Sequence, residues 1–195
     1  HSANRALQNV CLTYLAATGN YLEVIEKQFE SADNMTTSLA SLQNAARYAI
    51  ECFPKLSAEF ETTWANDTLV MDKWFSINAS VNDDSMFDRL NELMHRNDFS
   101  LKNPNRARSL IGSFAMQNSK YFHCSTGQGY EFLANQIINL DKINPQVASR
   151  LITPLIQYKS YNKKHQQLMK DQLVRIQAET NLSRDLVEKL DATIK

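Results

Sequence analysis

The sequence is poor in the residues that make tight turns. Of its 195 residues, only four are glycine and four are proline, against average usages of about 7% and about 5%. Collagen-like, low-complexity and turn-rich chains all contain more of one or both. The scarcity therefore favours helices joined by short connections.

An excess of charge of either sign is also absent. Lys plus Arg and Asp plus Glu both number 21, so the formal net charge is zero. Binding to nucleic acid or to an anionic membrane draws mainly on concentrated positive charge, and we expect neither partner. No apolar run approaches the roughly 18 residues that cross a bilayer, and the N-terminus lacks a signal-peptide layout. We expect a soluble chain with a cytoplasmic location.

Catalytic and metal-binding motifs are missing as well. Cys11, Cys52 and Cys124 are odd in number and never form C-x-x-C, which argues against a disulfide framework or a zinc ribbon. His123 beside Cys124 offers two isolated ligands, too few for a closed zinc site. The sequence has no H-E-x-x-H, G-x-S-x-G, P-loop or G-x-G-x-x-G. It predicts no catalytic residue, metal ligand or cofactor of its own.

Helical periodicity is what the sequence does contain. Near the N-terminus, apolar residues recur at i, i+3, i+4, i+7 and i+8, which places them on one face of a helix. They are Leu7, Val10, Cys11, Tyr14 and Leu15. Gly19 marks the end of this helix, and similar stripes recur along the chain. No segment alternates convincingly with a period of two, so we expect about ten to thirteen short helices and no sheet.

Two helix starts are marked with particular clarity. Asn103-Pro104 and Asn144-Pro145 each place a capping side chain before a proline at the first helical position, where the missing N–H costs nothing. Pro154 is predicted to interrupt the second of these helices, because proline removes a helical hydrogen bond.

Short helices with one apolar stripe each bury those stripes by stacking on their neighbours. No strict repeat of about 33 to 47 residues is visible. We therefore predict an all-α fold, an irregular HEAT/armadillo-like α-solenoid or superhelix that forms a single domain over residues 1–195.

Four strings carry a resemblance to a known family. They are Asp72–Phe75 (DKWF), Asn103–Gly112 (NPNRARSLIG), the Gly127-x-Gly129-Tyr130-x-Phe132-Leu133 segment, and Asn144–Leu151 (NPQVASRL). In this order and spacing they resemble the C-terminal helical domain of bacterial aminopeptidase N, the alanyl-aminopeptidase type of zinc metallopeptidase. The resemblance runs from about residue 3 to the end of the chain.

The resemblance implies a parent enzyme that removes N-terminal residues from peptides with a zinc ion held in a preceding catalytic domain. This chain would close the active-site cavity and limit entry to small peptides, and it would be inactive alone. Its partners would be the catalytic domain of the same polypeptide and peptide substrates. Gln146 matches a glutamine near the pocket for the substrate's N-terminal side chain, and Arg108 and Arg150 match arginines that face the internal channel.

Simpler interpretations exist for these residues. An arginine in the first turns of a helix is most often solvated or ion-paired at the surface, and Gln146, at the second helical position, has a capping role available to it. Trp74 and Phe75 are expected in the core, because aromatic residues on an amphipathic face supply packing area.

The sequence departs from the family pattern at Thr126, where relatives commonly carry an acidic residue before the first glycine. Asn78 also stands where a glutamine is expected after the DKWF string. The alternative hypothesis is a free-standing helical scaffold that binds a partner peptide or helix in a concave groove.

Overall fold

The computed structural model describes residues 2–48 and 50–194, and within these ranges every regular element is a helix. The chain divides into two compact units, unit 1 over residues 1–89 and unit 2 over residues 90–195. Within the described residues, no helix combines the length and the apolar character that a membrane span requires. Apolar residues also recur at helical spacing between residues 39 and 53, and one of them, Ala49, lies outside the described residues.

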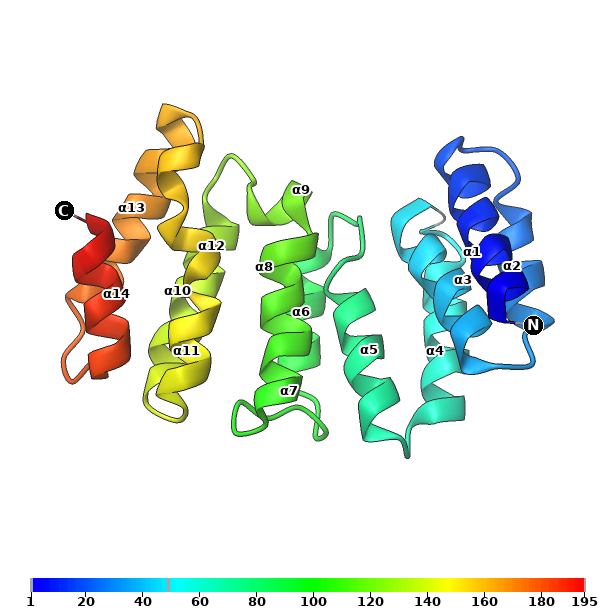
Figure 1. The fold of residues 1–195 in the computed structure, drawn as a ribbon, viewed down its shortest axis with the longest axis horizontal. Helices are drawn as coiled ribbons and strands as arrows, with labels where there is room; N and C mark the ends of the chain where they lie inside the picture. The colour runs from blue at the N-terminus through cyan, green and yellow to red at the C-terminus, as the bar shows by residue number, and fades with distance from the viewer. Residues whose placement is uncertain (1, 49, 195) are drawn as a thin grey trace. The chain divides into compact units, whose positions relative to one another are not determined.

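In unit 1, α3 packs against α1, α2 and α4, and α4 packs against α5 (Figure 1). Their bounds are α1 (Ser2–Ala17), α2 (Glu23–Glu30), α3 (Met35–Tyr48), α4 (Phe53–Trp64) and α5 (Thr68–Asn78), and α6 (Met86–Met94) crosses the boundary between the units. Ile25, Leu42, Phe53 and Phe75 are fully buried. Burial of each such side chain contributes about 1.5–3 kcal/mol, so these residues hold the unit together.

Local signals place the helix ends of unit 1. Asp67 accepts hydrogen bonds from the backbone N–H groups of Leu69 and Val70 at 3.0 and 3.1 Å and caps α5. Gly19 adopts a φ of +73° just after α1, a conformation that glycine reaches without strain. Asn34 accepts from the Thr37 N–H at 3.0 Å, so α3 begins at Met35.

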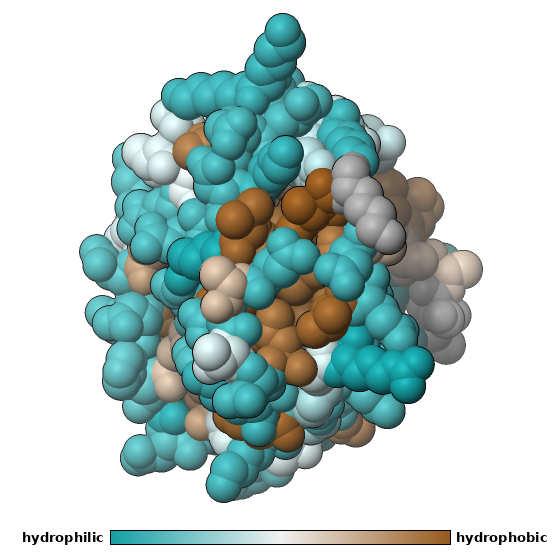
Figure 2. Space-filling model, turned by 90° about the vertical axis from the view of Figure 1, so that its left-hand side faces the viewer, coloured by the Kyte–Doolittle hydropathy of each residue, from teal (hydrophilic) through white to brown (hydrophobic). Residues whose placement is uncertain are grey.

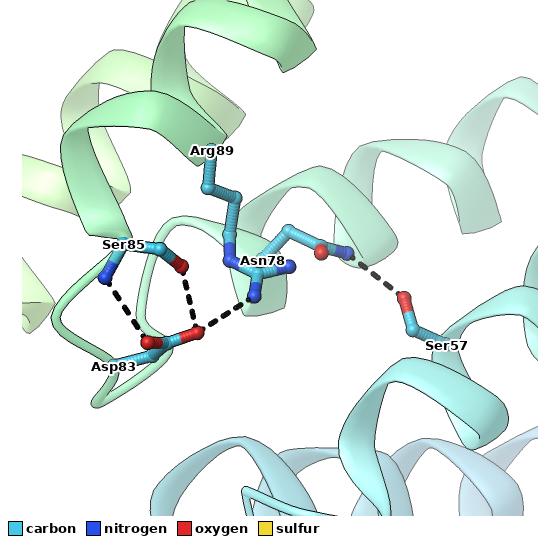
Figure 3. Close-up of polar contacts among 5 residues, drawn as sticks. All are labelled: Ser57, Asn78, Asp83, Ser85 and Arg89. Atoms are coloured by element: carbon cyan, nitrogen blue, oxygen red, sulfur yellow. Dashed lines mark hydrogen bonds and ion pairs between the residues drawn. The ribbon is translucent and has the colours of Figure 1, made fainter.

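Trp74 of the DKWF string and Asn78, four residues after it, join α5 to α4, and Figure 3 shows the contact from Asn78 to Ser57. The Trp74 indole N–H donates to the Ser57 carbonyl at 3.1 Å. The Asn78 amide donates to the Trp74 carbonyl at 3.0 Å and to the Ser57 hydroxyl at 3.4 Å. Trp74 and Phe75 are buried, as predicted. Asn78 therefore serves a structural purpose here, since its amide satisfies buried polar groups of both helices.

A second joint fixes the start of α6 (Figure 3). The Asp83 carboxylate accepts hydrogen bonds from the Ser85 backbone N–H at 3.0 Å and hydroxyl at 2.8 Å, and from Arg89 at 3.1 Å. These bonds, those from Ser85 first, lower the pKa of Asp83. The Arg89 guanidinium also lies 5.4 Å from the Phe53 ring centroid, which ties the first turn of α6 to α4.

Unit 2 contains both of the helix starts that the Asn-Pro pairs mark. Its elements are α7 (Pro104–Ala107), the π-helical η1 (Arg108–Gly112), α8 (Ser113–Gln117), α9 (Ser119–Phe122), α10 (Gln128–Asp141), α11 (Pro145–Leu151), α12 (Thr153–Ile156), the 3₁₀ turn η2 (Tyr158–Ser160), α13 (Lys163–Gln177) and α14 (Arg184–Ile194). Within this unit, α10 packs against α11 and α13, and α14 packs against α11 and α13. Pro154 lies in the first turn of α12, and the break predicted there is confirmed.

Candidate functional site

The two Asn-Pro starts position the candidate site residues. The Asn103 side chain accepts from the backbone N–H groups of Asn105 and Arg106 at 3.1 and 3.3 Å, and α7 begins at Pro104. The Asn144 side chain accepts from the Val147 N–H at 3.2 Å, and α11 begins at Pro145. Both caps are confirmed, and each satisfies backbone donors that a helix start otherwise leaves unpaired.

Gln146 and Arg150 lie four residues apart on α11, so both side chains are on the same side of the helix. Both are exposed. The opposite side of α11 is buried through Val147, Ala148 and Leu151. Among the described residues, no hydrogen bond or ion pair engages the Arg150 guanidinium or the Gln146 amide. The capping role available to Gln146 is taken by Asn144 instead.

Arg108 is exposed at the start of η1, the segment that packs against α11. Its guanidinium donates to the Asn105 side chain at 3.3 Å. Gly112 permits the close approach, because a Cβ at that position would lie 3.1 Å from Leu151 Cδ2. The structure therefore places the three predicted residues on two adjacent segments, which the sequence separates by about forty positions.

The segments that carry these residues are electropositive. The sequences of α7, η1 and α11 contain arginine but no aspartate or glutamate. A guanidinium without an acidic partner is free to take a ligand carboxylate through two parallel hydrogen bonds. This arrangement is suited to an anionic group such as the C-terminus of a peptide.

Polar contacts hold α11 and α14 in place from the buried side. The Asp141 carboxylate at the end of α10 accepts from the Ser183 N–H at 2.8 Å and hydroxyl at 2.5 Å. The Ser183 hydroxyl in turn accepts from the Leu186 N–H and so caps α14. The Lys189 ammonium of α14 donates to the carbonyl of Ser149 on α11. Arg150 thus extends from a helix that is anchored on its other side.

A second cluster joins α10 to α13 through the hydroxyl of Tyr130. This hydroxyl lies 2.7 Å from His123 Nδ1 and 2.9 Å from His165 Nδ1. The Tyr161 ring stacks on His123 at a centroid distance of 4.6 Å, and Phe122 meets Tyr130 edge to face at 5.2 Å. Sequence reasoning considered His123 as a metal ligand and missed the cluster, because only tertiary packing brings His165 beside Tyr130.

The hydrogen bonds of this cluster limit where the protons of Tyr130 and the two histidines can lie. The Tyr130 hydroxyl has one proton, so it donates to one histidine and accepts from the Nδ1–H of the other. Burial, and then the nearby Tyr161 and Cys124, raise the pKa of Tyr130 to about 12, which keeps the proton on the oxygen. Burial, and then the neighbouring His165, lower the pKa of His123. We infer that His123 is neutral above pH 6.5 and that the cluster is structural.

The loop before α10 carries the neutral Thr126 at the position where an acidic residue is expected in relatives. The Thr126 hydroxyl lies 3.2 Å from Cys124 Sγ. Burial raises the pKa of Cys124, but hydrogen bonds from Thr126 and from the N–H groups at the start of α10 outweigh it and lower the pKa overall. Gly127 reaches a φ of +78° at the helix cap. Gly129 allows contact with α9, because a Cβ there would lie 2.6 Å from Phe122 Cα.

Within residues 2–48 and 50–194, no group of three or more His, Cys, Asp or Glu side chains is arranged to hold a metal ion. The residues of this part of the chain therefore do not fit a zinc centre. The chemistry that the site supports is binding of an anion or a polar ligand.

Comparison with known proteins agrees with the resemblance found in the sequence. The chain is 45% identical over 193 residues to aminopeptidase N of Haemophilus influenzae, which covers 99% of this chain and 22% of that protein. It is 42% identical over 190 residues to aminopeptidase N of Escherichia coli, covering 96% of this chain and 22% of that protein. The chain thus spans about a fifth of the length of these relatives.

A solved structure is similar as well. The crystal structure of Legionella pneumophila aminopeptidase A in complex with aspartic acid matches with a TM-score of 0.88 and 31% sequence identity, over 97% of this chain and 23% of that one. Residues 1–195 also match the family described as "Domain of unknown function (DUF3458_C) ARM repeats". Because that match covers the whole sequence, the all-helical ARM-repeat prediction is confirmed, and the chain belongs to the DUF3458_C ARM-repeat family.

Proposed function

We propose that this chain is the C-terminal helical domain of a zinc-dependent aminopeptidase of the aminopeptidase N type. The observation that carries the proposal is the similarity to aminopeptidase N over 99% of the chain. In the parent enzyme this domain closes the active-site cavity and restricts entry to small peptides. The zinc ion belongs to the catalytic domain of the same polypeptide, which is the partner of this chain.

The three exposed residues of α11 and η1 line the channel in this proposal. Arg108 and Arg150 meet the C-terminal carboxylate of a bound peptide, and Gln146 contacts the N-terminal side chain of the substrate. The supporting observations are the exposure of all three and the absence of acidic residues from their segments. Charge-assisted bonds to a carboxylate strengthen where a closed cavity excludes water.

The proposal places the parent enzyme in the cytoplasm. Cys11, Cys52 and Cys124 are all free thiols, as is usual in a reducing compartment.

The test compares two kinds of substrate. In the complete enzyme, Arg108→Ala and Arg150→Ala should each lower kcat/KM for tri- and tetrapeptides about tenfold to a hundredfold, because a hydrogen bond to a charged group contributes about 1.5–3 kcal/mol. Hydrolysis of an alanyl amide should change little, since that substrate has no distant carboxylate.

Arg184→Ala is the matched control, because the side chain of that arginine is 89% exposed on α14 and pairs with the neighbouring Glu188. It should leave both substrates unaffected. Equal losses on peptides and on the alanyl amide would contradict the channel role of Arg108 and Arg150.

A further inference from the structure

The outward side of α1 has an unusual composition. The apolar stripe predicted for this helix, here called the α1 stripe, consists of Leu7, Val10, Cys11, Tyr14 and Leu15. Leu7 is 65% exposed, Val10 is 53% exposed and Tyr14 is 72% exposed, and Cys11 is exposed too. The expectation that this stripe packs against its neighbours in the chain is therefore wrong for α1.

The opposite side of α1 makes the contacts within unit 1. Leu12 and Ala16 are buried there, and the Gln28 amide of α2 donates to the Asn9 side chain at 3.1 Å. Successive helical residues are rotated by about 100°, which puts this contact surface on the far side of the helix from Leu7 and Tyr14. Thus α1 presents its more apolar side to solvent and a partly polar side to its own unit.

A helix that ends a repeat array normally does the reverse, because its outer face meets water. Helix α14 buries Leu186 and Leu190 and pairs Arg184 with Glu188 at its surface, where Val187 is 38% exposed. The side of unit 2 that carries α13 and α14 shows an apolar patch enclosed by hydrophilic side chains (Figure 2). The α1 stripe runs over two turns of a helix whose single charged residue is Arg5.

The chemistry of the α1 stripe defines what covers it. The stripe offers no acidic or basic side chain for an ion pair, so its partner presents an apolar face. The i, i+3, i+7 spacing of Leu7, Val10 and Tyr14 fits the groove of another helix. Repeats of the ARM type bury their faces by stacking on adjacent repeats, and this chain accounts for only 22% of the length of its aminopeptidase relatives.

We propose that the α1 stripe is the docking surface for an amphipathic helix from another part of the same polypeptide. The inference rests on the proposed function, because it is the parent enzyme that supplies this helix. Docking removes Leu7, Val10 and Tyr14 from water and completes the stacking that α1 leaves open on its outer side.

Cys11 reports on this surface directly. The full-length polypeptide is treated with a maleimide under native conditions and, separately, in denaturant, and the Cys11 peptide is quantified by mass spectrometry. A docked helix should make native alkylation of Cys11 at least about tenfold slower than alkylation in denaturant. Native alkylation at the denatured rate would overturn the proposal.

Two variants sharpen the measurement. Val10→Asp puts a charge in the covered surface and should restore the reactivity of Cys11. Val187→Asp is the matched control, because Val187 is 38% exposed on α14, and it should leave Cys11 protected. The wild-type measurement is decisive even where the Val10→Asp protein does not fold.

The remaining outcomes separate this inference from the proposed function. An active full-length peptidase with a fully reactive Cys11 overturns the docking and leaves the function standing. Protection of Cys11 in a full-length protein without peptidase activity supports the docking and overturns the proposed function. Protection that disappears on dilution identifies a second copy of the chain as the occupant and overturns the assignment to a helix of the same polypeptide.

Discussion

Replacement of Tyr130 by Phe should destabilise unit 2 measurably. The substitution keeps the buried ring, which contacts Phe122 at 5.2 Å, and removes only the hydroxyl that bridges His123 and His165. Each hydrogen bond contributes about 1 kcal/mol net, and a buried group left without a partner costs about 1–3 kcal/mol. Because both histidines are half-buried, water reaches the freed nitrogens in part. We expect a loss of about 2 kcal/mol.

The assay is urea unfolding of the 195-residue chain at pH 7.5, followed by circular dichroism. Tyr158→Phe is the matched control, since its hydroxyl makes one long bond of 3.4 Å to the Thr193 carbonyl and should contribute under about 1 kcal/mol. A double-mutant cycle with His165→Ala should be clearly non-additive. If Tyr130→Phe and Tyr158→Phe have equal effects, the bridging hydroxyl does not hold α10 to α13.

Two further predictions concern the same region. The folded-state pKa of His123 lies below its ordinary value of 6.5, so the unfolded chain binds more protons. The stability that this group contributes should be complete above about pH 6.5 and should decline as the pH falls toward the folded-state pKa. Between pH 7.5 and pH 5.5, the free energy of unfolding should therefore fall less in His123→Asn than in the wild-type chain. Gly129→Ala should cost about 1–3 kcal/mol or more, because the new Cβ meets the backbone of Phe122 at 2.6 Å. Gly112→Ala should cost less, because its Cβ meets the flexible side-chain ends of Leu151 at 3.1 Å and Met116 at 3.4 Å. Equal melting temperatures for the two variants would contradict this.

Local chemistry is what the sequence predicted well. The caps at Asn103 and Asn144 and the break at Pro154 were all recognisable, because each depends on a side chain and its near neighbours in the sequence. The π-helical turn that begins at Arg108 had no such signal, since it arises where the helix packs against α11.

Contacts between distant residues were harder to predict. Periodicity found the apolar side of α1, but it does not say what covers that side, and Leu7 and Tyr14 prove to be exposed. The bridge from Tyr130 to His165 depends on how α13 lies on α10, which no spacing in the sequence encodes. For Arg108, Gln146 and Arg150, the resemblance predicted their function and the structure adds their exposure on adjacent segments.

The size and activity of the native polypeptide test the central claim most directly. An antibody raised against this chain is used to probe and deplete an extract of the source cells. The proposal predicts a band several times heavier than 22.3 kDa, because the relatives are several times longer than the chain, and loss of alanyl-aminopeptidase activity on depletion. A band of 22.3 kDa whose removal leaves that activity unchanged would contradict the claim and favour a free-standing helical scaffold.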